Sequence, residues 1–340
     1  MKRKLGLLIA SVLLLTLALG LLTACGDSGQ SDDSDDAGDS DGSVATSASI
    51  KLATGGTSGT YYAFGGVVAQ TLMGKVPGLD ISVQSTGASR ANIIMVHDNE
   101  VEMAIVQNDV MDYAYNGTDL FENEKTDGFR SMAGAYAEVC QIVVNPSAGI
   151  SSVADLAGKR VSVGDVGSGV EFNARQILAA YDLTFDDIQR QNLSFADSAT
   201  AMQDGKIDAF FCTAGAPTTA ITELATTSKI AILNVDGAAA ARLIAEHPFY
   251  TPYTITVDKG YKGMEQDAVT VAVKATFIVS PSLSEELVYN MTKALFENKD
   301  EIAVGHNKGT ELDPAYAVEG VSVPFHPGAE KYFKEIGVLS

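Results

Sequence analysis

Short apolar segments alternate with helical segments along most of this chain, and glycine or hydroxyl residues stand where the apolar segments end. Such alternation is typical of βαβ units, whose strands pair in parallel. Six segments have the strand pattern, three before Pro146 and three after it: 49–54, 80–85, 102–107, 159–163, 207–212 and 230–235. The sequence therefore predicts an α/β fold of two lobes, each a mostly parallel sheet flanked by helices.

Capping residues indicate where the intervening helices begin. Four starts are marked: Ser152 before a short turn, Ser168 before a helix over 170–181, Asp197 before one over 199–204, and Pro217 in a first turn. Two further helices are predicted near the C-terminus, over 284–298 and 329–336.

Two longer β-rich runs, 138–144 and 269–279, lie at the junctions between the two series of strands. We interpret them as strands that cross between lobes. The expected division is lobe one over 49–140 and 275–340, and lobe two over 141–274. A chain of 340 residues is long enough for two such lobes.

The first 48 residues differ in composition from the rest. A basic start and an apolar run from Leu5 to Leu22 precede Cys25, and this pattern resembles a bacterial lipobox. We therefore expect a lipoprotein signal peptide over 1–25 with Cys25 lipidated; a transmembrane helix is the alternative. Residues 26–48 contain seven Asp and no basic residue, which predicts a disordered acidic tether. The expected location is the cell envelope, extracytoplasmic, with the lipid as the sole membrane anchor.

Net charge and motif content limit the classes of function. A net charge of −20 argues against nucleic acid as a partner. The G-x-S-x-G match at 38–42 lacks the strand and helix that a nucleophile elbow needs, and the glycines at 164–169 do not have dinucleotide-binding spacing. The histidines are scattered rather than paired at metal-ligand spacing. We therefore predict no catalytic residues, no metal and no cofactor. Cys140 and Cys212, in apolar strands, are expected to be buried free thiols, with a disulfide as the alternative.

The loops that follow the predicted strands are the candidate binding site. In open parallel sheets these loops gather at one crevice, where glycines allow close approach and helix starts favour negative charge. Five hydroxyl residues supply possible donors: Thr57, Ser58, Thr86, Ser89 and Ser168. Each such loop alone also fits an ordinary helix cap. Their joint placement favours a shared site for a carboxylate.

Other residues near these loops leave alternatives open. Asn92 and Gln107 are either ligand contacts or exposed polar groups. Of Tyr61 and Tyr62, one is expected in the core and the other at the site. Arg90, in the first turn of a helix, either faces solvent or clamps a carboxylate.

The chain resembles the TAXI family of solute-binding proteins that serve TRAP transporters. The resemblance extends over most of 49–339 and is strongest in these stretches: GGTSGTYYAFGGVVAQ (55–70), STGAS with Asn92 (85–92), IVQND (105–109), VGSGVEFNARQILAAY (166–181), GKIDAFFCTAGAPTTAI (205–221), LVYNMTKALFEN (287–298) and PFHPGAEKYFKEIG (324–337).

This resemblance implies a two-lobed periplasmic-binding-protein fold of type II, a small organic acid as ligand, glutamate-like or a dicarboxylate, and an integral-membrane TRAP permease driven by an ion gradient as partner. It implies ligand contacts at Thr57, Ser58, Tyr61, Ser85, Gln107, Asn108, Ser168, Gly215 and the adjoining helix start at Gly169. Arg90 and the segment 254–261 depart from the family pattern, which leaves the solute open. A sensory receptor that presents its ligand to a signalling partner is the alternative to transport, and an enzyme is disfavoured because no nucleophile and base are paired.

Overall fold

The computed structural model describes residues 47–340, except for the side chain of Leu120. The predicted signal peptide with Cys25, and the tether as far as residue 46, lie outside the described residues. Ala48, which was assigned to the tether, is the first residue of strand β1, and its N–H donates to the carbonyl of Gly78 at 2.9 Å. Within the described part of the chain, no helix is both long enough and apolar enough to span a bilayer.

Ten strands of the described chain form one sheet: β1 (Ala48–Ala53), β2 (Leu79–Gln84), β3 (Met103–Gln107), β4 (Arg130–Val144), β5 (Arg160–Ser162), β6 (Gln189–Gln191), β7 (Ala209–Ala214), β8 (Ala231–Leu233), β9 (Thr251–Ile255) and β10 (Ala268–Val279). Their order is β2-β1-β3-β10-β4-β7-β5-β6, with β8 paired to β4 and β9 to β10. Strands β2, β1 and β3 are parallel, as are β6, β5 and β7.

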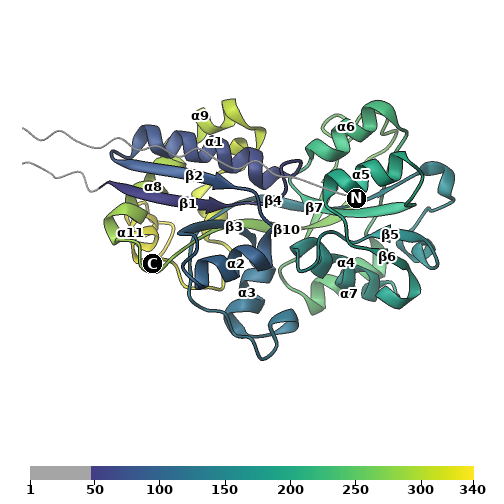
Figure 1. The fold of residues 1–340 in the computed structure, drawn as a ribbon, viewed down its shortest axis with the longest axis horizontal. Helices are drawn as coiled ribbons and strands as arrows, with labels where there is room; N and C mark the ends of the chain where they lie inside the picture. The colour runs from purple at the N-terminus through teal and green to yellow at the C-terminus, as the bar shows by residue number, and fades with distance from the viewer. Residues whose placement is uncertain (1–46) are drawn as a thin grey trace, which may run out of the picture. The chain divides into compact units, whose positions relative to one another are not determined.

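Helices surround the sheet in two groups, one around β1–β3 and one around β5–β7, with the long strands β4 and β10 between the groups (Figure 1). The α-helices are α1 (Thr60–Lys75), α2 (Ser89–His97), α3 (Asn108–Asn116), α4 (Gly169–Ala180), α5 (Phe195–Gln203), α6 (Thr219–Thr227), α7 (Gly237–Glu246), α8 (Glu285–Glu297), α9 (Lys299–Gly305), α10 (Pro314–Val318) and α11 (Pro327–Glu335). Short 3-10 helices are η1 (Asp119–Phe121), η2 (Pro146–Ala148), η3 (Val153–Leu156), η4 (Phe185–Asp187) and η5 (Asn307–Glu311).

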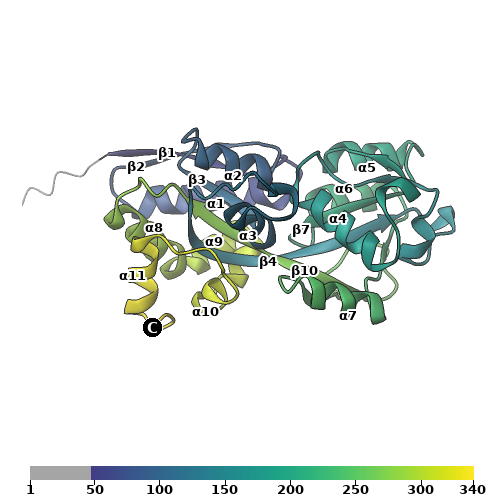
Figure 2. The ribbon, with the colours of Figure 1, turned by 90° about the horizontal axis from the view of Figure 1, so that it is seen from below.

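The two long strands β4 and β10 connect two groups of elements (Figure 2). We call the group of β1–β3, α1–α3 and α8–α11 lobe one, and the group of β5–β9 and α4–α7 lobe two. β4 and β10 pair antiparallel, with Ala272 opposite Val139 and Val279 opposite Arg130. Each strand belongs to both lobes, because Ala133 and Phe277 pack in the lobe-one core whereas Ile142 and Val271 pack in the lobe-two core. The lobe boundaries predicted from the sequence fall inside these two strands.

The predicted α/β fold is confirmed, with corrections to individual elements. The sheet is mixed, since the crossing strands run antiparallel to their neighbours. The segment predicted as a sixth parallel strand is β8, which pairs antiparallel with β4. β4 starts at Arg130 rather than 138, because the apolar run continues through a small-residue stretch that the sequence pattern did not mark. β6, β9, α7, α9 and α10 were not predicted.

Two of the predicted helix starts are also wrong. Ser194, not Asp197, caps α5, and its hydroxyl accepts from the N–H of Asp197 in the first turn. Pro217 precedes α6, whose N-cap is Thr218. The starts at Ser152 and Ser168 are confirmed, because each hydroxyl caps the element that follows it. Cys140 and Cys212 are buried and free, as expected.

The core of lobe one forms around Phe64 of α1. Its ring meets Tyr136 of β4 edge-to-face, with centroids 5.1 Å apart, and lies 6.1 Å from the ring of Phe277 of β10. Phe64 is fully buried, whereas Tyr62, two residues earlier on the same helix, is 37% exposed. The core side of α1 is therefore anchored to both crossing strands.

We expect Phe64→Ala to lower the free energy of unfolding by about 3–5 kcal/mol, because it removes a buried aromatic side chain from a packed core. Tyr62→Ala on the exposed side of α1 is the matched control and should change it by about 0.5 kcal/mol or less. Urea denaturation of both variants measures the difference, and equal losses would contradict the packing described for α1.

Candidate functional site

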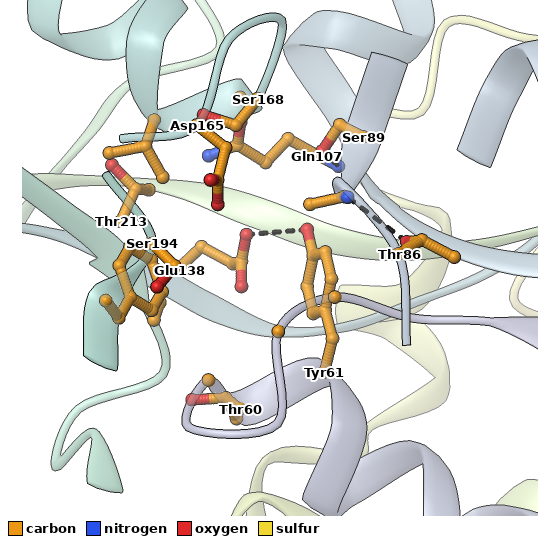
Figure 3. Close-up of a pocket in the computed structure, with 18 of the residues that line it drawn as sticks. Thr60, Tyr61, Thr86, Ser89, Gln107, Glu138, Asp165, Ser168, Ser194 and Thr213 are labelled. Carbon is orange, nitrogen blue, oxygen red and sulfur yellow. Dashed lines mark hydrogen bonds between the residues drawn. The ribbon is translucent and has the colours of Figure 1, made fainter. Parts of the chain in front are cut away.

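A cavity of about 50 Å³ lies between the two lobes and the crossing strand β4. Lobe one contributes Gly55, Gly56, Ser58, Gly59, Thr60, Tyr61, Thr86, Ala88, Ser89 and Gln107; lobe two contributes Asp165, Ser168, Gly169, Val170, Ser194, Phe195, Thr213 and Ala214; β4 contributes Glu138. Figure 3 shows the labelled polar side chains around this space. The cavity is thus formed jointly by segments far apart in the sequence.

The walls of the cavity are largely the starts of four helices: α1, α2, α4 and α5. The first N–H groups of a helix have no acceptor within that helix, and the helix dipole makes this end positive. The loop before α4 turns through Gly164 and Gly167, whose φ angles of 88° and 74° favour glycine. Several partly positive backbone ends therefore face one small space, which is suited to an anionic group.

Ala88 at the start of α2 has an unusual backbone conformation for a residue with a side chain, with φ 66° and ψ −146°. The hydroxyl of Thr86 accepts from the Ala88 N–H at 3.1 Å, and the same hydroxyl donates to the Thr54 carbonyl at 3.0 Å. Thr86 thus holds the strained residue in place at the cavity wall.

Seven of the twelve residues predicted to bind ligand line the cavity: Ser58, Tyr61, Thr86, Ser89, Gln107, Ser168 and Gly169. The other five, Thr57, Ser85, Asn92, Asn108 and Gly215, are not part of its wall. Asn92 is fully buried and donates to the carbonyls of Thr54 and Ile105, at 2.6 and 2.8 Å. It connects two strands of lobe one, so it is not the exposed group considered from the sequence, and it lies outside the cavity wall.

The remaining off-wall residues have contacts nearby. Asn108 accepts from the N–H of Lys274 at 2.9 Å, which connects α3 to β10. Ser85 donates to the Gly55 carbonyl at 2.9 Å, and the Gly215 carbonyl accepts from the Thr60 hydroxyl at 3.1 Å. Thr57 is exposed.

Arg90 is also outside the cavity wall. Its Nη2 lies 2.8 Å from Oε2 of Glu124, and its guanidinium lies 5.3 Å from the centroid of the Phe121 ring. This arrangement ties α2 to the segment that follows α3. The carboxylate clamp that the sequence left open is therefore not formed in this structure.

Glu138 is the main wall residue that the sequence analysis missed. Its carboxyl is buried on β4, and Oε2 accepts from the hydroxyl of Tyr61 at 2.7 Å. Burial raises the pKa of Glu138 to about 8, with the neighbouring charge of Asp109 acting in the same direction. An acidic residue at the head of an apolar run, 138–144, was the available signal. Tyr61 packs in the core and also lines the cavity, whereas Tyr62 does neither.

Hydrogen bonds join the two lobes directly beside the cavity. Gln107 Nε2 of lobe one donates to Oδ1 of Asn173 in α4 at 2.8 Å, and Asn173 Nδ2 donates to Oδ2 of Asp109 at 3.0 Å. Burial raises the pKa of Asp109 to about 7. On the opposite side of the cavity, the Thr60 hydroxyl donates to the Gly215 carbonyl, and the Ser58 carbonyl accepts from the Ala220 N–H. The lobes are therefore closed on each other.

An aromatic contact extends this closure. The ring of Phe172 in α4 stacks on Tyr113 of α3, with centroids 6.1 Å apart, and on Phe121, 6.5 Å away. Phe172 is fully buried and belongs to the same hydrophobic cluster as the α2 and α3 side chains of lobe one. Lobe two thus inserts an aromatic side chain into a lobe-one core.

We expect Gly169→Ala to disfavour the closed arrangement. A Cβ at this position would lie 1.4 Å from Oε1 of Gln107, so Gln107 would have to leave its bond with Asn173. Alanine favours helix, so lobe two should still fold. Small-angle scattering should show a larger radius of gyration than in the wild type. Gly66→Ala, where a Cβ meets nothing within 4 Å, is the control, and unchanged scattering of both variants would refute the effect.

A second prediction concerns Glu138 and stability. The raised pKa means that, between about pH 5 and pH 8, the folded state binds more protons than the unfolded state, so this group destabilises the fold as pH rises. Glu138→Gln has no group that titrates there. Its free energy of unfolding, measured by urea denaturation, should therefore rise relative to that of wild type as the pH rises from about 5 to about 8. Hydrogen bonds from Ser151 and Ser152 lower the pKa of Asp155, so the effect of Asp155→Asn should stay constant over the same interval. A flat difference for Glu138→Gln would contradict its burial.

Comparisons with known proteins agree with this geometry. Three solved structures have a TM-score of 0.50 to this chain: a protein from Bordetella bronchiseptica RB50 (18% identity, 86% of this chain, 89% of that one), a putative L-cystine ABC transporter from Listeria monocytogenes (15%, 78%, 98%), and PhnD1 from Prochlorococcus marinus in complex with methylphosphonate (10%, 76%, 90%). At these identities the likeness establishes the fold alone, an α/β fold with a mixed sheet and flanking helices. The NMT1-like family matches residues 52–337. The chain belongs to the NMT1-like family.

Proposed function

We propose that this chain is an extracytoplasmic receptor that captures a small organic acid between its lobes and delivers it for uptake. The observation that supports this most directly is the cavity, since four helix starts from both lobes face it. A ligand held there contacts both lobes at once. It would therefore favour the closed arrangement over an open one, which is the differential affinity that a closing receptor requires.

The composition of the cavity wall fits a protein that binds its ligand rather than an enzyme that converts it. Among the described residues that line the cavity there is no His, Cys or Lys to pair with the hydroxyl groups. The hydroxyl and amide groups of Ser58, Ser89 and Gln107 are suited to orienting a ligand. The cavity is also small, which suits a compact solute.

The proposed partner is an integral-membrane TRAP permease that uses an ion gradient. The support for this is the sequence resemblance over most of 49–339. One of the structures that share the fold is described as an ABC transporter, so the energy source needs a direct test. Anchoring through Cys25 would hold the receptor at the membrane surface and is part of the same proposal.

The receptor function predicts that at least one small acid raises the melting temperature and compacts the protein in solution. The panel should include succinate, glutarate, aspartate and glutamate, read by thermal shift and small-angle scattering. Gly59→Val should abolish both responses, since a Cβ at Gly59 would lie 3.4 Å from the ring of Phe195 and the valine methyl groups would extend beyond it. If no acid of the panel produces either response, the proposed function is wrong.

Transport is tested separately with the full-length receptor. Proteoliposomes that contain the candidate permease should accumulate the identified acid only with receptor present and an ion gradient imposed. Accumulation that requires ATP would assign the receptor to an ABC-type system. Ligand binding without uptake by either system would favour the sensory alternative.

A further inference from the structure

All ionisable side chains on the cavity wall, apart from tyrosine, are acidic. Glu138 and Asp165 line it, and none of the described wall residues is Lys, Arg or His. Figure 3 shows both carboxyl groups directed toward the space between the labelled side chains. A site built only to hold anions would not be expected to place two carboxyl groups there, because the Asp165 carboxylate repels an anion and Glu138 would do so whenever it is ionised.

Two basic side chains of lobe one are engaged in ion pairs of their own. Arg90 is paired with Glu124, and Lys308 is paired with Glu311. Lys308 is almost fully buried, 2% exposed, and its ammonium lies 5.7 Å from the centroid of the Tyr136 ring. Neither of them is part of the cavity wall, so the wall contains no cation to balance its two carboxyl groups.

Two hydrogen-bond acceptors on the cavity wall have no donor among the described residues. Oε1 of Gln107 is buried and has no hydrogen-bond partner among the described residues. Within the same part of the chain, the Asp165 carboxylate takes part in no hydrogen bond or ion pair, and it lies at the more exposed edge of the cavity. Buried polar groups are normally paired, so the Gln107 acceptor indicates a ligand that brings a donor, and the Asp165 carboxylate is exposed and free to accept a second hydrogen bond.

The cavity therefore presents both hydrogen-bond donors and hydrogen-bond acceptors to a ligand. The helix starts offer N–H donors to an anion, whereas Glu138, Asp165 and Gln107 offer oxygen acceptors. Only a ligand with both an acidic and a donor end satisfies the two. An ammonium group is the donor that gains most, because a hydrogen bond between two ionised groups is stronger than a neutral one.

We propose that the captured acid carries an amino group, and that Glu138 is the specificity-determining residue that accepts a hydrogen bond from it. This inference rests on the proposed receptor function and narrows its ligand from organic acids in general to amino-bearing acids. Asp165 adds a second negative charge at the cavity edge. The hydroxyl of Tyr61 orients the Glu138 carboxyl from the other side.

The test is calorimetric titration of the folded receptor with two pairs of acids that differ only in the α-amino group: glutamate against glutarate, and aspartate against succinate. For at least one pair, the amino-bearing acid should bind at least about tenfold more tightly to wild type, since one charged hydrogen bond contributes that much. Glu138→Gln keeps the shape and the acceptor for Tyr61 but not the charge. It should reduce the preference for the amino-bearing acid over its plain partner by about tenfold or more.

Glu124→Gln, which is remote from the wall, is the control and should retain the wild-type preference. Plain acids that bind as tightly as their amino-bearing partners, or a preference that survives Glu138→Gln, would overturn the inference while leaving the receptor function intact. If no acid binds at all, the proposed function itself fails.

Proton release provides a second readout. Glu138 is acted on by Tyr61 of α1, Tyr136 of β4, Asp109 of α3 and Lys308 of η5, and burial favours its neutral form near pH 7. An ammonium partner would ionise it, so binding at pH 7 should release protons into the buffer, seen as a dependence of the binding heat on the buffer's ionisation enthalpy. Glu138→Gln should abolish that release. Binding without proton release would mean that Glu138 stays neutral and acts as a donor, and would overturn the inference.

Discussion

The pairing of β4 with β10 is the constraint on which the rest of the described structure depends. Both strands contribute side chains to the cores of both lobes, so neither core can form without them. Their antiparallel register places Glu138 opposite Val273, at the junction between the lobes. The same pairing that holds the two cores together therefore also delivers a buried carboxyl to the cavity. A strand interior is a rigid support, and it fixes this group more firmly than a loop would.

Closure of the lobes uses polar and apolar contacts of different kinds. Gln107, Asn173 and Asp109 form a buried hydrogen-bonded chain, and Phe172 packs among aromatic side chains of lobe one. Buried polar groups are costly when unpaired, so the polar chain specifies one closed geometry, whereas the aromatic contact stabilises closure without such precision. Gly169 lies where these contacts meet the cavity, and its lack of a side chain is what lets Gln107 approach α4.

Much of the fold and part of the site could be predicted from the sequence. Strand patterns located β1, β2, β3, β5, β7 and β10, and Ser168 and Ser152 marked helix starts, because these signals are local. Pairing direction is not local, so β8 was expected in the parallel series and joins β4 antiparallel. Among the site residues, Ser58, Ser89 and Ser168 reach the cavity wall, whereas Asn92 and Asn108 face inward. An asparagine that binds a backbone carbonyl and one that binds a ligand look the same in a sequence.

The sequence by itself determined that the chain forms two α/β lobes whose glycine- and hydroxyl-rich loops follow strand ends, since periodicity and capping act over a few residues. Only the tertiary structure decided the charge of the cavity. Arg90 was a candidate clamp in the sequence, yet Glu124 and Phe121 engage it elsewhere. Glu138 lies in an apolar run, yet strand pairing turns it toward the cavity and burial changes its protonation. The physical reason is that charge pairing and burial depend on neighbours distant in sequence, which no local pattern specifies.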